Sequence, residues 1–191
     1  MSDELTEEMK QLLVVIDEYT EEASEENLTW IKELPLMAVI YQGIIDGIFK
    51  DYDYAPWSVP MLDGSRQLLN ISREGKDDLE DLLNLRMLSI LRLSTSKFGY
   101  LTAFRLTDLG KQVVDSIPQS IRDEVHAVIT DECNIPRAVL IRDRSFLFSC
   151  PKCKKEVQIP ICEIEDVSYE VKRYLPSYLH LGEEERREEI H

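Results

Sequence analysis

Long uncharged runs are missing from the sequence, and this absence sets the first limits on function. The longest such run, Leu34 to Ile45, is shorter than the roughly 20 apolar residues that a membrane-spanning helix needs. The opening residues MSDELTEEMK are acidic and lack an apolar core, so we expect no secretory signal. With 43% hydrophobic and 31% charged residues, the composition is that of an ordinary folded protein. We expect a soluble protein with no membrane partner, cytoplasmic or, in a eukaryote, nuclear.

Catalytic signatures are missing as well. The chain has no glycine-rich phosphate loop, no Gly-x-Ser-x-Gly elbow and no His-Glu-x-x-His motif. Histidines number only 3, and two of them, His180 and His191, lie near the C-terminus without an obvious partner. Carboxylates are abundant, but they lie in charge runs that solvation by water explains. We therefore expect a protein without a reaction of its own.

Positive charge is scarce and unevenly distributed. Lysine and arginine number 22 against 37 aspartates and glutamates, which gives a net charge of −15. Negative charge dominates residues 1–85 and 161–191, whereas residues 86–160 carry a small positive excess. A uniformly negative surface repels nucleic acid, but a basic segment between acidic ones can accept an anion or be covered by those acidic segments.

The hydrophobic pattern predicts an α+β protein that begins with a helical segment over residues 1–62. Apolar residues at helical spacing predict a first helix over residues 2–22, capped by Ser2. A second, mostly buried helix is predicted from Asn27 or Thr29 to about Phe49, with Pro35 in its first turn or at a kink. Two prolines and a glycine predict a loop over residues 51–65. Three further segments follow, at residues 63–118, 119–170 and 171–191, and the last is an acidic tail.

Residues 76–117 predict a helix, a β-hairpin and another helix. Lys76 to Leu85 has helical spacing, and the runs LSILRLSTS and YLTAFRLTD alternate apolar and polar residues as half-buried strands do. The residues SKFG supply the turn between the two runs. Thr107 or Asp108 then caps a helix that ends before Pro118.

The residues FRLTDLGKQVV resemble the end of the wing in MarR-like and PadR-like regulators. This resemblance covers about residues 65–117 and implies a winged-helix domain. In DNA-reading winged helices, the helix before the hairpin enters the major groove and contacts bases and phosphates.

The corresponding helix in this chain, GKDDLEDLLNLR, is strongly acidic. At an effective dielectric constant of about 20, one pair of like charges about 4 Å apart costs roughly 4 kcal/mol. A base contact returns only about 1–3 kcal/mol, so we do not expect this helix to read DNA. Our first hypothesis is a protein-binding adaptor in a larger assembly, with the partner held by Asp77, Asp78, Glu80 and Asp81. The simpler interpretation, that these acids favour the helix N-terminus, leaves no DNA-reading surface either.

The alternative hypothesis is a transcription regulator that binds nucleic acid through the basic middle segment. A wing can follow phosphates while its helix stays away from the groove, and such binding weakens steeply with salt. The residues that would carry it are Arg86, Arg92, Lys97, Arg105, Lys152, Lys154 and Lys155.

The segment FLFSCPKCKKEVQI resembles the first knuckle of a zinc ribbon, because a Cys-x-x-Cys turn lies between two strands. Residues 119–170 are therefore expected to form a small cysteine-rich β module. Structural zinc takes four ligands in a tetrahedron, and thiolates are common among them. The usual second Cys-x-x-Cys is absent, but one further cysteine lies before this knuckle and one lies after it. We therefore predict ligation by the four cysteines of the chain, with His126 as a substitute candidate. These cysteines are Cys133, Cys150, Cys153 and Cys162.

Two other interpretations of the cysteines stay open. A thiol redox pair is one, but thioredoxin-like sites place the motif before a helix, whereas β-rich KEVQIPI follows here. The other is a set of unligated thiols packed in the core. A structural disulfide is not expected, because nothing in the sequence points to an oxidising compartment.

Overall fold

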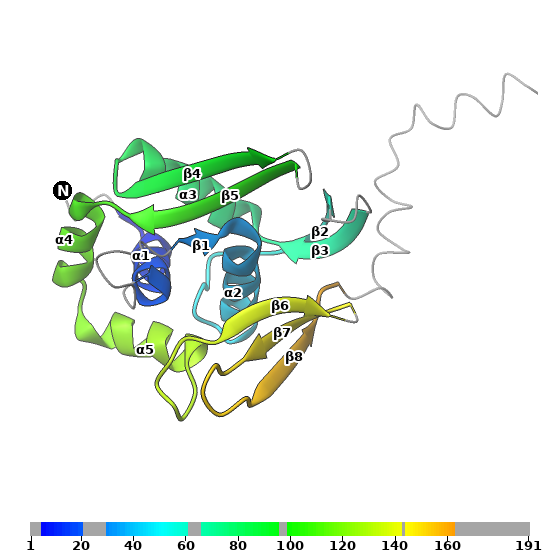
Figure 1. The fold of residues 1–191 in the computed structure, drawn as a ribbon. Coiled ribbons are helices and arrows are strands. Elements are labelled where there is room, and N and C mark those ends of the chain that lie inside the picture. The colour runs from blue at the N-terminus through cyan, green and yellow to red at the C-terminus, as the bar shows by residue number, and fades with distance from the viewer. Residues whose placement is uncertain (1–4, 21–29, 61–65, 96–98, 143, 163–191) are drawn as a thin grey trace, which may run out of the picture. The chain divides into compact units, whose positions relative to one another are not determined.

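The computed structural model describes residues 5–20, 30–60, 66–95, 99–142 and 144–162 (Figure 1). The chain divides into two compact units, residues 1–161 and 162–191. Cys162 is the one described residue of the second unit, so the fold below is that of the first. Among the described residues, no helix is long and apolar enough to cross a membrane.

Helices and small antiparallel sheets alternate along the chain, which confirms the predicted α+β class. The helices are α1 (Glu7–Thr20), α2 (Glu33–Ile45), α3 (Arg73–Asn84), α4 (Asp108–Ser116) and α5 (Gln119–Ile129). One sheet has the order β1 (Ile31–Lys32), β5 (Gly99–Leu106), β4 (Leu88–Thr95). A two-stranded ribbon pairs β2 (Ala55–Pro60) with β3 (Arg66–Ile71), and a third sheet has the order β6 (Ala138–Arg142), β7 (Ser145–Ser149), β8 (Glu156–Pro160).

The two N-terminal helices form as predicted, with different bounds, and α2 ends at Ile45 instead of about Phe49. Helix α1 begins at Glu7, and Thr6 caps it by accepting a hydrogen bond from the Met9 amide at 3.0 Å. Ser2, the predicted cap, lies outside the described residues. Helix α2 begins later than predicted, because residues 31 and 32 pair with β5 as a short strand. Pro35 lies in the first turn of α2, where its missing N–H has no helical partner to lose.

Helix α2 lies in the centre of the core, as its apolar composition predicts. Its residues from Leu36 to Gly43 are all buried, and Tyr41 is among the largest fully buried side chains. The ring of Tyr41 lies 6.2 Å from that of Phe146 on β7, so the C-terminal sheet packs on this helix.

The predicted helix, hairpin and helix over residues 76–117 are confirmed. Helix α3 begins three residues earlier than expected, because the hydroxyl of Ser72 accepts a hydrogen bond from the Gly75 amide at 3.1 Å. Strands β4 and β5 pair from Leu88 opposite Leu106 to Thr95 opposite Gly99. Thr107 caps α4, as predicted, by accepting from the Gly110 amide at 3.1 Å.

The prediction of a loop over residues 51–65 is wrong for residues 55–60, which form strand β2. Pro56 and Pro60 favour a loop in the sequence, yet both lie in β2, which pairs only with β3 among the described strands. Because the two prolines are four residues apart, their missing N–H groups fall on one edge of the strand, and an edge strand tolerates such a loss. Arg66 closes this ribbon by donating to the Ser58 carbonyl at 2.7 Å.

The ribbon joins the N-terminal and C-terminal halves of the first unit. The side-chain amide of Asn70 on β3 donates to the Tyr41 hydroxyl at 3.0 Å, and the backbone amide of Asn70 donates to the Ile161 carbonyl at 2.7 Å. Strands form on both sides of the Cys-x-x-Cys turn, as predicted, whereas helix α5 was not predicted. The four-segment division of the sequence stays a prediction.

Helix α4 depends on the absence of a side chain at Gly110. A Cβ atom at this position would lie 2.2 Å from the Met87 carbonyl oxygen, which accepts hydrogen bonds from Thr107. We predict that Gly110→Ala lowers the free energy of unfolding by about 1–3 kcal/mol, because the backbone must move to relieve the overlap. Urea denaturation measures this loss. The exposed Lys111→Ala on the same helix is the control, and equal midpoints for the two variants would contradict the prediction.

Candidate metal centre

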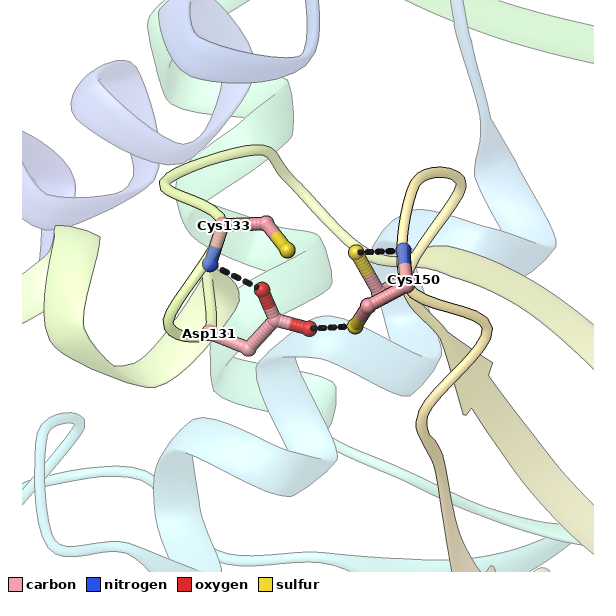
Figure 2. Close-up of side chains that lie close together, drawn as sticks. Asp131, Cys133 and Cys150 are labelled. Atoms are coloured by element: carbon pink, nitrogen blue, oxygen red, sulfur yellow. Dashed lines mark hydrogen bonds between the residues drawn. The ribbon is translucent and has the colours of Figure 1, made fainter.

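Two turns of the C-terminal half bring a carboxylate and three thiols together. Asp131 and Cys133 lie just after α5, and Cys150 and Cys153 lie in the turn between β7 and β8. The ligand atoms of these four residues all lie within 4.8 Å of one another. Figure 2 shows the Asp131 carboxylate pointing between the sulfur atoms of the two turns. This cluster can hold a metal ion.

Backbone hydrogen bonds shape both turns around their ligand atoms. In the second turn, the Cys153 amide points at the Cys150 sulfur at 3.4 Å, and the Lys154 amide donates to the Cys150 carbonyl at 3.1 Å. In the first turn, the Cys133 amide donates to Asp131 Oδ1 at 2.7 Å. The donor atoms therefore lie on the inner side of each turn.

A residue with positive φ follows the last ligand of each turn. Asn134 has φ 57° and Lys154 has φ 61°. Asparagine tolerates this left-handed conformation, but lysine adopts it only where the surrounding structure imposes it. The two conformations reverse the chain directly after Cys133 and Cys153, which keeps both sulfurs facing the opposite turn.

The spacing of the donor atoms suits a small tetrahedral ion. With Zn–S bonds of about 2.3 Å and a Zn–O bond of about 2.0–2.2 Å, a tetrahedron has S···S edges of about 3.8 Å and S···O edges of about 3.6 Å. The sulfur of Cys153 lies 3.6 Å from Asp131 Oδ2. Since every pair of donor atoms lies within 4.8 Å, closure around an ion requires movements of only about 1 Å. Oδ1 is held by the Cys133 amide, so Asp131 offers Oδ2 as a single ligand atom.

The protonation of the cluster is uneven. The Cys133 amide lowers the pKa of the Asp131 carboxyl, and the Cys153 amide lowers the pKa of the Cys150 thiol. Hydrogen bonding to Cys153, followed by burial, raises the pKa of Cys133 to about 12. A metal ion must displace the proton of Cys133 when it binds, because the thiolate is the ligand.

The cluster differs from the predicted ligand set in one member. Cys133, Cys150 and Cys153 are brought together as expected, and Asp131 stands in the place predicted for Cys162. Cys162 is buried and is not part of the cluster. The sequence signal for Asp131 is its position two residues before Cys133, but the chain has many carboxylates and only the fold distinguishes this one.

His126, the predicted substitute ligand, is engaged elsewhere. Its Nδ1 lies 3.1 Å from Glu18 Oε1 on α1, and its Nε2 is hydrogen-bonded to the side chain of Asn134. These bonds, that to Asn134 first, raise the pKa of His126. The histidine therefore connects the first turn of the cluster to α1, and both of its ring nitrogens already have hydrogen-bond partners.

Arg137 makes a second connection between the first turn and α1. Its guanidinium donates to the carbonyls of Val128 and Thr130 at 2.6 and 2.7 Å, which gives hydrogen-bond partners to carbonyls at the C-terminal end of α5, where the helix itself supplies none. The hydroxyl of Tyr19 on α1 donates to the Arg137 carbonyl at 2.9 Å. The turn that carries Asp131 and Cys133 is thus fixed to α1 and α5 independently of any ion.

The four predicted partner-binding acids divide into two kinds. Asp77, Glu80 and Asp81 are exposed on α3, and we call these three residues the acidic face. Asp78 is half-buried and accepts a hydrogen bond from the Tyr52 hydroxyl at 2.6 Å. Burial raises the pKa of the Asp78 carboxyl. Asp78 therefore binds Tyr52 within the protein, whereas the acidic face is open to a partner.

The predicted nucleic-acid-binding residues are placed in different settings. Arg86, Arg92 and Lys152 are exposed, whereas the guanidinium of Arg105 lies over the Trp30 ring at 4.7 Å from its centroid. Two residues beside the cluster are engaged: Lys154 Nζ donates to the Pro151 carbonyl at 2.7 Å, and Lys155 Nζ lies 3.3 Å from Glu132 Oε1. Lys97 lies outside the described residues.

Comparison with known proteins gives a family without a known activity. The model of the uncharacterized protein MJ1567 family matches residues 8–160. The chain belongs to this family. No curated protein and no solved structure matches the chain. The matched residues include all four members of the cluster and end before Cys162.

The ligand set makes a direct prediction for metal binding. Asp131→Asn keeps the shape of the side chain but removes the charge of a ligand, so we expect zinc affinity to fall at least about tenfold. Cys162→Ser is the matched control and is expected to bind zinc like the unaltered protein. Chelator competition with elemental analysis measures both. A large loss with Cys162→Ser and none with Asp131→Asn would contradict the ligand set.

Proposed function

We propose that the chain is a non-catalytic adaptor protein whose C-terminal sheet is held by a structural zinc ion. The main support for this proposal is the cluster that two separate turns form from Asp131, Cys133, Cys150 and Cys153. Three soft thiolates and one carboxylate in a compact site favour zinc over magnesium or calcium, which prefer oxygen ligands. The thiol ligands also support a reducing compartment, cytoplasmic or, in a eukaryote, nuclear.

The region from α3 to α4 is proposed to be a winged-helix module used for protein docking. Support comes from the order of helix α3, hairpin β4–β5 and helix α4, which is that of the second half of a winged-helix domain. The β2–β3 ribbon between α2 and α3 is an addition of this chain to that order. In this proposal, α3 takes the place of the helix that reads DNA in MarR-like and PadR-like regulators.

The partner proposed for α3 is a basic segment of another protein. The acidic face presents three exposed carboxylates on one helix, and Asp77 lies 3.8 Å from a cation of the same helix, Arg73. Salt bridges at such exposed positions contribute little, so Arg73 does not neutralise the face. Complementary charge would steer a basic partner toward α3 and repel nucleic acid.

The adaptor proposal is tested by removing the charge of the acidic face. We expect the triple variant Asp77→Ala, Glu80→Ala, Asp81→Ala to lose capture of its protein partner in a pull-down from the native source. The control triple variant Asp108→Ala, Asp115→Ala, Glu124→Ala removes the same charge from exposed positions on α4 and α5. Equal capture by both variants would count against the acidic face.

The second candidate function is nucleic-acid binding through the hairpin side. The observation that favours it is the exposure of Arg86 and Arg92, at the end of α3 and on β4. It predicts duplex binding at low salt that weakens steeply with added salt and on replacing both arginines by alanine. Fluorescence anisotropy with a labelled duplex measures this. The adaptor proposal predicts no binding at low salt, and retained duplex would contradict it.

A further inference from the structure

We propose that Cys153 is a site of oxidation by hydroperoxides, and that a Cys150–Cys153 disulfide then releases the zinc ion. The inference deepens the proposed function and rests on the zinc site it contains. It assigns different roles to the three cysteines of the cluster, on the basis of their exposure and the turns that carry them.

Exposure distinguishes Cys153 from the other cysteines. Its side chain is exposed, whereas Cys150 is 0% exposed and Cys133 is half-buried. A peroxide in solution therefore reaches the Cys153 sulfur first. The cysteine outside the cluster, Cys162, is also buried and offers no competing target.

The position of Cys150 makes it the partner for the second step. It lies three residues before Cys153 in the same turn, and the Cys153 amide already points at its sulfur at 3.4 Å. The short loop keeps the two sulfurs near each other with or without an ion, because closing a short loop costs little entropy. Cys133 lies in the other turn, so no short loop of the chain holds its sulfur near that of Cys153.

The chemistry is a two-electron oxidation of two thiolates. The Cys153 sulfur attacks a peroxide oxygen, the O–O bond breaks, and the departing oxygen takes a proton to leave as water or an alcohol. The Cys150 thiolate then attacks the sulfenic acid sulfur, forming the S–S bond, and the hydroxide that leaves takes a second proton. One hydroperoxide and two protons are consumed, and the two sulfurs are oxidised.

Disulfide formation leaves too few ligands to hold the ion. Only Asp131 and Cys133 remain, whereas a structural zinc site needs four ligands. The first turn stays fixed by Arg137 and His126. The ion pair between Lys155 and Glu132, at 3.3 Å, still spans the two turns, but both of its side chains are exposed and such pairs contribute little. The two turns are then free to separate.

Zinc release and disulfide mapping on the full chain test the inference. Zinc-loaded protein, with its zinc content measured first, is treated with one to ten equivalents of hydrogen peroxide in the presence of a zinc-sensitive dye. Trypsin cleaves after Lys152, so the four cysteines fall on separate peptides, residues 123–137, 145–152, 153–154 and 156–172. We expect about one zinc released per disulfide, and peptide 145–152 linked to peptide 153–154.

The controls separate this inference from the zinc proposal. Cys162→Ser is expected to release zinc like the unaltered protein, and a 1,3-diketone trap is expected to label Cys153 before any other cysteine. Protein that binds no zinc before peroxide is added overturns both proposals. Bound zinc that resists ten equivalents of peroxide overturns the oxidation site alone, as does first labelling or disulfide formation at Cys133 or Cys162.

Discussion

Four acidic donor groups within 4.8 Å of one another are the constraint on which the C-terminal half depends. Once they are deprotonated, these groups repel one another unless a cation lies between them. Without an ion, the raised pKa of Cys133 keeps a proton on that sulfur, and backbone amides point at Asp131 and Cys150. With an ion, the same amides stabilise the ligands in place, so the site is organised for a cation before one binds.

Different parts of the structure hold the two turns of the cluster. The first turn is held by Arg137, which caps α5, and by His126, which reaches Glu18 on α1. The second turn is held by its own hydrogen bonds and by the sheet that ends in β7 and β8. A metal ion between them would therefore join the sheet to α1 and α5, which is a structural role and requires no reaction.

The sequence was a good guide wherever local chemistry decides the structure. The buried helix α2 follows from its apolar composition, the cap at Thr107 from its position before α4, and the turn at Cys150 and Cys153 from its spacing. Each of these features depends on neighbouring residues. Local patterns suffice for them because no distant contact is needed to select the conformation.

The features that the sequence did not predict depend on contacts between distant segments. Strand β2 forms despite Pro56 and Pro60 because β3 pairs with it, and β3 is itself anchored to Tyr41 and Ile161. Helix α5 has apolar residues at helical spacing, but it follows Pro118 without a side-chain cap, so no capping residue in the sequence marks its start. Asp131 joins the cluster only because the fold places it opposite Cys153.

X-ray absorption at the zinc edge tests the central claim most directly, because it counts the atoms bound to the ion in the intact protein. A zinc ion held by Asp131, Cys133, Cys150 and Cys153 would have three sulfurs at about 2.3 Å and one oxygen at about 2.0–2.2 Å. Four sulfurs would show that a fourth cysteine has displaced Asp131. A shell composed only of oxygen and nitrogen would contradict the site altogether.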